Sequence, residues 1–395
     1  MLDFDPFSLD FHADPYPTYK ILRDDYPLYH NERLNFWALS RYEDVVKASL
    51  DWETYSSAGG TSLEFPPSVV KMLPPYIIYM DPPRQVRLRK LVSKGFTPRR
   101  VASLEEGIRE TARDLLKPLV ARGSFDFVKE FASVLPMAVI GKLIGFPDSD
   151  LDMIREKSAD MLTRTPGSSE IPPEAAKAGY KLLKYYLNFV QEARKNPPDN
   201  VLGALLEAEV ADDAGGQLEK LTDDELVAFA MLFGTAGAET AVKLLGNLCA
   251  LFQEEPDVLQ RIMADTSLLK SATEEALRLL PPSQYQGRTL TRDVTMYGKT
   301  MREGDRVILL TGAACRDERE YENPDKFDID RSIPISLAFG HGIHKCLGAP
   351  LARNEVRICF EEFFKLVSSY KIDHDKTERV FMSNVHGYSG IPISF

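Results

Sequence analysis

Apolar residues recur with helical spacing along most of the chain, so the sequence predicts a mainly α-helical fold. Between Val101 and Val210 this pattern is interrupted at three places, each of which contains proline. The breaks are Pro147, Thr165–Pro173 and Asn196–Asp199. We expect the middle break to separate two helices and to form a flexible connection of the kind found in lids.

The longest predicted helix runs from Leu221 to Pro256. Thr222 and Glu225 form a T-x-x-E capping box at its start, and the proline ends the pattern. A helix of about thirty residues spans roughly 45–50 Å, which is long enough to cross a domain.

The centre of this long helix is almost wholly apolar, yet it departs from ordinary helix composition. Gly234 and Gly237 each cost up to about 1 kcal/mol relative to alanine, and the one carboxylate, Glu239, stands beside Thr240. Several departures in one place favour a functional site. The alternative is that the glycines are contacts between packed helices and that Glu239 reaches solvent.

A smaller β-rich part is predicted outside the helical regions. Phe36–Leu39 is strand-like, and we interpret the first 50 residues as β-rich. Residues 56–83 are rich in Gly, Ser and Pro, which predicts a long irregular loop, either functional or a surface excursion. After a helix at Leu268–Leu280 the period changes towards strands, with turns at Gly298 and Gly304. Ala313–Arg331 is predicted to be irregular, and the C-terminus after Val380 is strand- and turn-like.

The twelve residues from Phe339 to Pro350 read F-G-H-G-I-H-K-C-L-G-A-P. Gly340 and Gly342 allow positive φ angles and a close approach of the backbone to a bulky ligand. The apolar spacing becomes helical from Leu347, so Cys346 is expected at a helix N-terminus, where unpaired N–H groups favour a thiolate. A thiolate in a glycine-lined turn suits an axial ligand of haem iron.

Other interpretations of this stretch are a plain glycine turn with a buried cysteine, a phosphate-binding loop, a zinc site and a covalently attached haem. The phosphate-binding spacing G-x-x-x-x-G-K-[ST] is absent. No second cysteine lies within two to four residues, which disfavours zinc, and the C-x-x-C-H of attached haem is also absent. For a lone cysteine near glycines, the plain turn is the commoner outcome.

Composition restricts the class of protein further. The chain has 395 residues, of which 44% are hydrophobic and 27% charged, as in ordinary globular proteins with a sizeable core. The N-terminus lacks a basic region followed by an apolar run, and no stretch of eighteen uncharged apolar residues occurs, so we expect a cytoplasmic protein without a membrane anchor. Four scattered cysteines favour a reducing compartment. A net charge of −11 makes nucleic acid an improbable partner.

The cysteine stretch resembles the signature F-G-x-G-x-H-x-C-x-G of the cytochrome P450 family. The matching positions are Phe339, Gly340, Gly342, His344, Cys346 and Gly348. Further family segments follow in the right order along nearly the whole chain. They are Asp81-Pro82-Pro83 with Arg89 for D-P-P-x-H-x-x-x-R, Ala236-Gly237-Ala238-Glu239-Thr240 for A-G-x-[DE]-T, Glu275 and Arg278 for E-x-x-R, then Arg288 and Arg331.

The resemblance implies a fold, a cofactor and an activity. The fold is the mainly α cytochrome P450 fold with a smaller β-rich part, as one haem domain over residues 1–395. Haem b, with the thiolate of Cys346 as axial ligand, is expected between the long distal helix and the proximal helix that follows the cysteine. The expected activity is a monooxygenase that inserts one oxygen atom from O2 into a hydrophobic small molecule.

The resemblance also assigns roles to single residues. Thr240 and Glu239 would deliver protons, and Ala236 and Gly237 would leave room for bound oxygen. Arg89, Arg288 and His344 would hold the haem propionates, and Phe339, Gly340 and Gly348 would frame the ligand loop. Gln85 stands where the family has histidine; an amide can donate a hydrogen bond but cannot carry charge, so we expect altered propionate anchoring. Glu275, Arg278 and Arg331 would form a structural triad.

Electrons are expected from a ferredoxin or flavodoxin, because the chain has no room for a flavin or iron–sulfur module. The acid-free run Arg84–Arg100 carries seven basic residues and is either a solvated helix face or, with Lys345, a docking surface for an acidic partner.

Apolar candidates for substrate contact are Ile77, Ile78, Leu232, Thr235, Ala236 and Val385, with Gln284 and Gln286 as polar ones. Rival functions are a peroxide-driven haem-thiolate enzyme and a non-enzymatic haem sensor.

Overall fold

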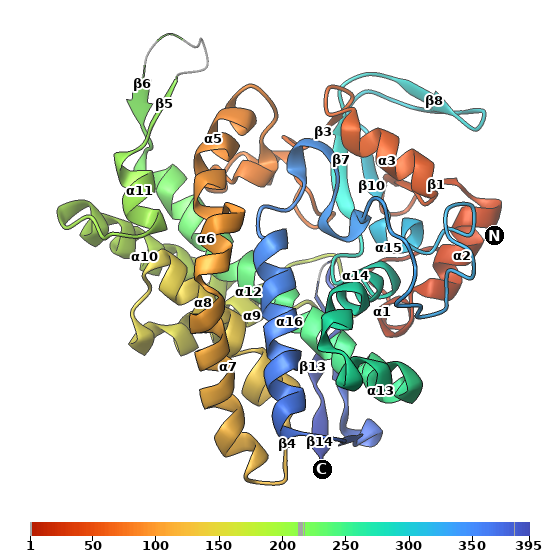
Figure 1. Ribbon diagram of the computed structural model, residues 1–395. Helices are drawn as coiled ribbons and strands as arrows, with labels where there is room; N and C mark the ends of the chain where they lie inside the picture. Colours follow the sequence, from red (N-terminus) through yellow and green to blue (C-terminus); the bar gives the residue numbers. More distant parts are fainter. Residues whose placement is uncertain (1, 212–215, 217, 383) are drawn as a thin grey trace.

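The computed structural model describes residues 2–211, 216, 218–382 and 384–395, and most of them are helical (Figure 1). The α-helices are α1 Leu9–Ala13, α2 Tyr16–Asp25, α3 Tyr42–Leu50, α4 Pro67–Val70, α5 Arg84–Val92, α6 Pro98–Ser103, α7 Glu105–Val120, α8 Leu135–Ile144, α9 Leu151–Leu162, α10 Pro173–Lys195, α11 Val201–Glu207, α12 Asp223–Glu254, α13 Pro256–Ala264, α14 Leu269–Leu279, α15 Thr311–Ala314 and α16 Ala349–Leu366.

Short 3-10 and π turns link these helices. They are η1 Ile77–Tyr79, η2 Ser93–Phe96, η3 Phe127–Ala132, η4 Asp148–Asp150, η5 Thr266–Leu268, η6 Leu337–Phe339, η7 Gly342–His344 and η8 His374–Lys376. The strands are β1 Leu28–Asn31, β2 Phe36–Leu39, β3 Tyr55–Ser56, β4 Ser124–Asp126, β5 Glu209–Ala211, β6 Leu218–Lys220, β7 Gln286–Leu290, β8 Val294–Met296, β9 Lys299–Met301, β10 Arg306–Leu309, β11 Lys371–Ile372, β12 Glu378–Arg379, β13 Tyr388–Gly390 and β14 Pro392–Ser394.

The largest sheet has five strands in the order β1-β2-β10-β7-β3. Strands β2 and β10 run parallel, with Val307 opposite Trp37, and the other neighbours are antiparallel. Strand β2 has the bounds that the apolar run Phe36–Leu39 predicted. The prediction that the first 50 residues are β-rich is wrong, because helices α1, α2 and α3 occupy more of this segment than the two four-residue strands do.

Helix α12 confirms the predicted long helix. The Thr222 hydroxyl accepts from the Glu225 amide at 3.3 Å, and the Glu225 carboxylate accepts from the Thr222 amide at 3.0 Å, which completes the capping box. Among the described residues, α12 is the one helix that is long and apolar enough to cross a membrane, but 78% of its most apolar window is buried by the rest of the fold. It is the central core helix.

The other helices pack around α12 and leave a space next to the loop before α16. Helices α8, α9, α10, α14 and α16 all pack on α12, and α7 lies along α16 (Figure 1). The predicted breaks in the helical region fall between α8 and η4, between α9 and α10, and between α10 and α11. Strand β4 was not predicted there, because its partner is β14 at the far end of the chain.

Candidate functional site

The loop before α16 has the glycine geometry that the sequence predicted. Gly340 and Gly342 have φ angles of 69° and 70°, which favour glycine. A Cβ on Gly342 would also lie 2.4 Å from the Ser49 carbonyl oxygen, so no other residue fits. The Cys346 amide donates to the Phe339 carbonyl at 2.8 Å, which closes the loop.

Cys346 lies just before α16, whose N-cap is Gly348 and whose first residue is Ala349. The amides of Gly348 and Ala349 hydrogen bond to the thiol, and the guanidinium groups of Arg89 and Arg353 face it; all four interactions favour the thiolate. Burial outweighs them and raises the pKa of the Cys346 thiol. The side chain is exposed only in the sense that it borders a cavity, whereas the other three cysteines are buried.

The cavity that Cys346 borders has a volume of about 320 Å³. It lies between the middle of α12 and the cysteine loop, and α5 and β7 contribute further walls. The structure brings most of the predicted site residues to this one cavity. They are Ile77, Ile78, Gln85, Arg89, Leu232, Ala236, Gly237, Thr240, Gln286, Arg288, Phe339, Gly340, His344, Cys346 and Gly348.

Arg288 and His344 form a cradle for anions on one side of the cavity. Arg288 is buried in β7, and its Nη1 donates to the Gly287 carbonyl at 2.7 Å; among the described residues no carboxylate lies within ion-pair distance of it. Burial lowers its pKa to about 10. His344 lies nearby, its Nε2 has no hydrogen-bond partner among the described residues, and burial together with the Arg288 charge lowers its pKa to about 4. The Asp81 carboxylate acts on Arg288 only from beyond ion-pair distance, and a buried cation without a directly paired carboxylate is costly, so these residues fit a ligand that carries carboxylates.

The Gln85 amide presents its oxygen, and not the expected N–H donor, to the cavity. Its Nε2 donates to the Ile343 carbonyl at 2.8 Å, and its Oε1 is buried without a partner among the described residues. The opposite amide orientation would place two oxygen atoms against each other, so the hydrogen bond fixes the assignment. Arg89 likewise donates to the Lys345 carbonyl. Both α5 side chains therefore hold the backbone of the cysteine loop, and Gln85 presents an acceptor to the cavity.

The acid and the alcohol of α12 point in different directions. Thr240 lines the cavity, and its hydroxyl donates to the Ala236 carbonyl at 3.1 Å. Glu239 is buried outside the lining, and its Oε2 lies 3.2 Å from Nζ of Lys243, one helical turn further on. Glu239 therefore neither reaches solvent, as the alternative for this helix required, nor borders the cavity.

The prediction of three further substrate contacts is wrong, because these side chains lie outside the cavity lining. The Thr235 hydroxyl is 3.4 Å from the Ser158 hydroxyl in α9. The Gln284 amide accepts from the Tyr19 hydroxyl at 3.0 Å and donates to a backbone carbonyl. Val385 packs in a small apolar cluster near the C-terminus. Each side chain is engaged by a segment distant in sequence.

Other lining residues were missed by the sequence analysis. Phe96 and Ile140 border the cavity from η2 and α8, and Ser283 receives a hydrogen bond from Gln286 at 2.7 Å. No local pattern distinguishes the two apolar residues from core positions. Glu355 in α16 also borders the cavity; it is buried, its Oε1 is unpartnered among the described residues, and burial raises its pKa well above the usual value.

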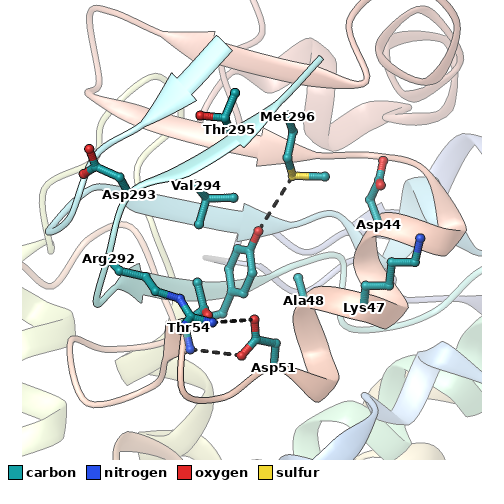
Figure 2. A pocket seen from close by; sticks show the side chains of 11 residues that line it. Asp44, Lys47, Ala48, Asp51, Thr54, Arg292, Asp293, Val294, Thr295 and Met296 are labelled. Carbon is teal, nitrogen blue, oxygen red and sulfur yellow. Dashed lines mark hydrogen bonds and ion pairs between the residues drawn. The ribbon is translucent and has the colours of Figure 1, made fainter. Parts of the chain in front are cut away.

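A second hollow lies on the surface between α3 and the β8–β9 hairpin (Figure 2). Its charged side chains already have partners in the protein: Asp51 faces Arg292 at 3.6 Å, Asp293 pairs with Arg302 at 2.6 Å, and Asp44 accepts from the Tyr297 hydroxyl at 2.7 Å. A hollow whose charges are satisfied internally has less need of a ligand than the cradle around Arg288. The cavity at Cys346 is therefore the candidate active site.

Comparisons with known proteins agree with this fold and this site. The family model described as Cytochrome P450 matches residues 168–384. A putative cytochrome P450 123 of Mycobacterium tuberculosis is 43% identical over 401 residues, covering 100% of this chain and 97% of the relative. A vitamin D(3) 25-hydroxylase of Pseudonocardia autotrophica is 36% identical over 399 residues, covering 99% and 96%.

The crystal structure of CYP109E1 from Bacillus megaterium in complex with testosterone superposes with a TM-score of 0.87 at 29% identity, covering 98% of both chains. Together the fold and these relatives define a monooxygenase. The chain belongs to the cytochrome P450 family, and specifically to its bacterial type. The resemblance seen in the sequence is thereby confirmed, and the family implies a haem-thiolate cofactor, a redox partner and the use of O2.

Proposed function

We propose that the chain is a single cytoplasmic haem domain over residues 1–395 that oxidises a hydrophobic small molecule, with haem b held by Cys346. The observation that carries the proposal is one cavity that joins Cys346, the unpaired Arg288 cradle and Thr240. Haem with a thiolate ligand supplies the oxygen-activating chemistry. The glycines of the cysteine loop allow the backbone to approach the ring closely, and Arg288 with His344 would bind its propionates.

The groups that would bind the propionates are those cavity groups that have no partner of opposite charge among the described residues. Arg288 offers N–H groups that no carboxylate of the described residues occupies, and His344 would donate from Nε2 once a propionate charge favours the protonated imidazole. Gln85 offers an acceptor, so it would meet a propionate only through a water molecule that donates to both. We therefore assign the main anchoring to Arg288 and His344, with Arg89 shared between the ring and the Lys345 carbonyl.

Thr240 is proposed to pass protons towards the reacting oxygen. Its hydroxyl borders the cavity and hydrogen bonds to the Ala236 carbonyl, so it can accept a proton on one side of Oγ1 and release one on the other. Glu239, the preceding residue, is the proposed proton source. Gly237 has no side chain, so it leaves space on the helix beside Thr240. A Cβ at this position would lie 3.1 Å from Cδ1 of Ile140.

The substrate is proposed to be a hydrophobic small molecule. Ile77, Ile78, Phe96, Ile140 and Leu232 give the cavity an apolar lining beside its charged residues. A related protein is named a vitamin D(3) 25-hydroxylase and a structural neighbour was solved with testosterone, so vitamin D(3) and testosterone are the first compounds to test.

Electrons are proposed to come from an acidic ferredoxin or flavodoxin that docks where α6 lies beside α16 and α5 contacts the cysteine loop (Figure 1). Lys90, Lys94, Arg99, Arg100 and Lys345 are exposed there and have no ion-pair partner among the described residues. Lys90→Glu with Arg99→Glu should slow reduction of the haem and leave its spectrum unchanged. Lys371→Glu in β11 is the matched control, and equal reduction rates for both variants would refute this docking surface.

The haem assignment is tested by the absorbance of the dithionite-reduced protein with carbon monoxide. Thiolate ligation gives a strongly red-shifted Soret band, which should be lost in Cys346→Ser and retained in Cys249→Ser. A band typical of histidine ligation in the unmodified protein would overturn the assignment. Titration with testosterone or vitamin D(3), followed by the change in iron spin state, tests the substrate class separately.

A further inference from the structure

Helix α12 contains a buried charged pair whose members do not line the cavity. Lys243 is 4% exposed and Glu239 is 6% exposed, with 3.2 Å between Nζ and Oε2. Residues four apart share one face of a helix. Among the described residues, Glu239 is the carboxylate within ion-pair distance of Lys243. Taking both charges out of water costs free energy that an apolar pair would not.

The surroundings of Lys243 hold its side chain in place. A Cβ on Gly387 would lie 2.7 Å from Cβ and 3.1 Å from Cγ of Lys243, so the backbone at Gly387 lies directly against the lysine stem. The neighbours of Lys243 on α12, Val242 and Leu244, are buried apolar residues. The ammonium group is therefore directed back along the helix towards Glu239.

The pair lies next to the cavity but outside its lining. Ala236, Gly237 and Thr240 border the cavity, whereas Glu239 and Lys243 do not. Successive residues of a helix point about 100° apart, so Glu239 is turned away from the face that carries the Thr240 hydroxyl. The position of Glu239 is set by Lys243, because the Oε2 atom has no hydrogen-bond donor other than this ion-pair contact among the described residues.

We propose that Lys243 is a positioning residue for proton delivery, which rests on the proposed roles of Glu239 and Thr240. The Glu239 carboxylate, ionised in its pair with Lys243, first takes up a proton from solvent and then releases it through water to the Thr240 oxygen. The release restores the carboxylate, and the Lys243 ammonium stabilises the charge that forms. Without the ammonium the same step would leave an unpaired charge in the core, so proton release would be slower.

The first test uses the resting ferric protein and does not depend on turnover. Lys243→Met and Glu239→Gln should each raise the urea-unfolding equilibrium constant. For Lys243→Met the increase should be on the order of a hundredfold, because the Glu239 carboxylate stays buried without its partner. The double variant should recover most of that loss, and Lys270→Met, which removes an exposed lysine of α14, should change little. If the two single effects add in the double variant, the pair is not coupled and the proposal is overturned.

The second test measures proton delivery with a substrate that shifts the spin state. Lys243→Met should raise the solvent deuterium isotope effect and lower the product formed per electron pair, with an unchanged spectral titration by the substrate. Lys243→Arg should restore both quantities, which a purely structural role would not require. The arginine variant and the double variant also keep the test open if Lys243→Met does not fold.

Failure of this inference and failure of the proposed function give different results. If Thr240→Ala and Glu239→Gln both leave coupling and isotope effect unchanged, the proposed proton path itself is wrong. If those two variants change both quantities while Lys243→Met matches the unmodified enzyme, the path stands and the role of Lys243 is refuted.

Discussion

Replacement of Arg278 in α14 should cost far more stability than loss of a surface ion pair. Arg278 and Glu275 are each 1% exposed, and the guanidinium contacts both carboxylate oxygens at 2.7 Å. Its remaining N–H groups donate to three carbonyl oxygens, those of Cys315 at 3.0 Å, Pro324 at 2.6 Å and Lys326 at 3.1 Å. All five N–H groups of the side chain are therefore used.

The magnitude follows from what Arg278→Ala leaves behind. The Glu275 carboxylate would stay buried with Arg331 as its remaining ion-pair partner, at 3.1 Å, and three carbonyls would lose a donor. Breaking one partner of a buried pair costs about 3–5 kcal/mol, out of a typical total of about 5–15 kcal/mol. Arg278→Lys keeps the charge but has fewer donors in a different geometry, so we expect an intermediate loss of about 2 kcal/mol.

The assay is urea unfolding followed by circular dichroism, with the haem absorbance recorded in parallel. The matched control is Arg261→Ala, because Arg261 also forms a two-bond pair, with Asp330 at 2.8 and 2.9 Å, but is 48% exposed. An exposed pair contributes about 0–1 kcal/mol. Equal midpoints for Arg278→Ala and Arg261→Ala would refute the reasoning that burial decides the cost.

Three further changes have clear expected outcomes. Burial raises the folded-state pKa of Glu355 above its unfolded value. The free energy of unfolding is therefore highest below the unfolded pKa, and it falls by about 1.4 kcal/mol per pH unit as pH rises towards the folded pKa. Glu355→Gln should abolish this loss in urea titrations between pH 5 and pH 8. Gly234→Ala would place a Cβ 2.0 Å from the Tyr186 hydroxyl oxygen, so it should lower the thermal midpoint by the equivalent of about 1–3 kcal/mol, whereas Gly107→Ala, with open space around it, should raise it slightly. Gln85→Met removes the donor to the Ile343 carbonyl, at about 1–2 kcal/mol, and should speed the loss of the red-shifted Soret band of the reduced carbon monoxide complex; an unchanged rate would contradict the role of Gln85 in holding the loop.

The parts of the fold that sequence predicted well are those fixed by local chemistry. The capping box of Thr222 and Glu225 marks the start of α12 within two residues, and the positive φ angles of Gly340 and Gly342 follow from the absence of a Cβ. The site residues carried by these local elements, including Cys346, reached the cavity together. Short-range geometry decides such positions before tertiary packing acts.

The parts that sequence missed depend on contacts between distant segments. Gln284 was expected to face a substrate, but Tyr19, 265 residues earlier, takes its amide oxygen. Strand β4 exists because β14 pairs with it, with Phe125 opposite Ile393. No local pattern in either segment contains this information, because each orientation is set by a partner that arrives only with the folded chain.

Helix α12 shows why unusual composition marks a site without assigning roles within it. Gly234 is required by the hydroxyl of Tyr186 in α10, so its cause is helix packing and not the cavity. Gly237 borders the cavity as well as Ile140, and Glu239 pairs inside the core with Lys243. The three departures thus have three causes, and they occur together because one core helix must pack against neighbours on some faces while another face borders the cavity. A lone lysine one turn after a lone carboxylate in an apolar helix is itself readable from sequence, and it would have indicated that the carboxylate is held by the helix and not by the ligand.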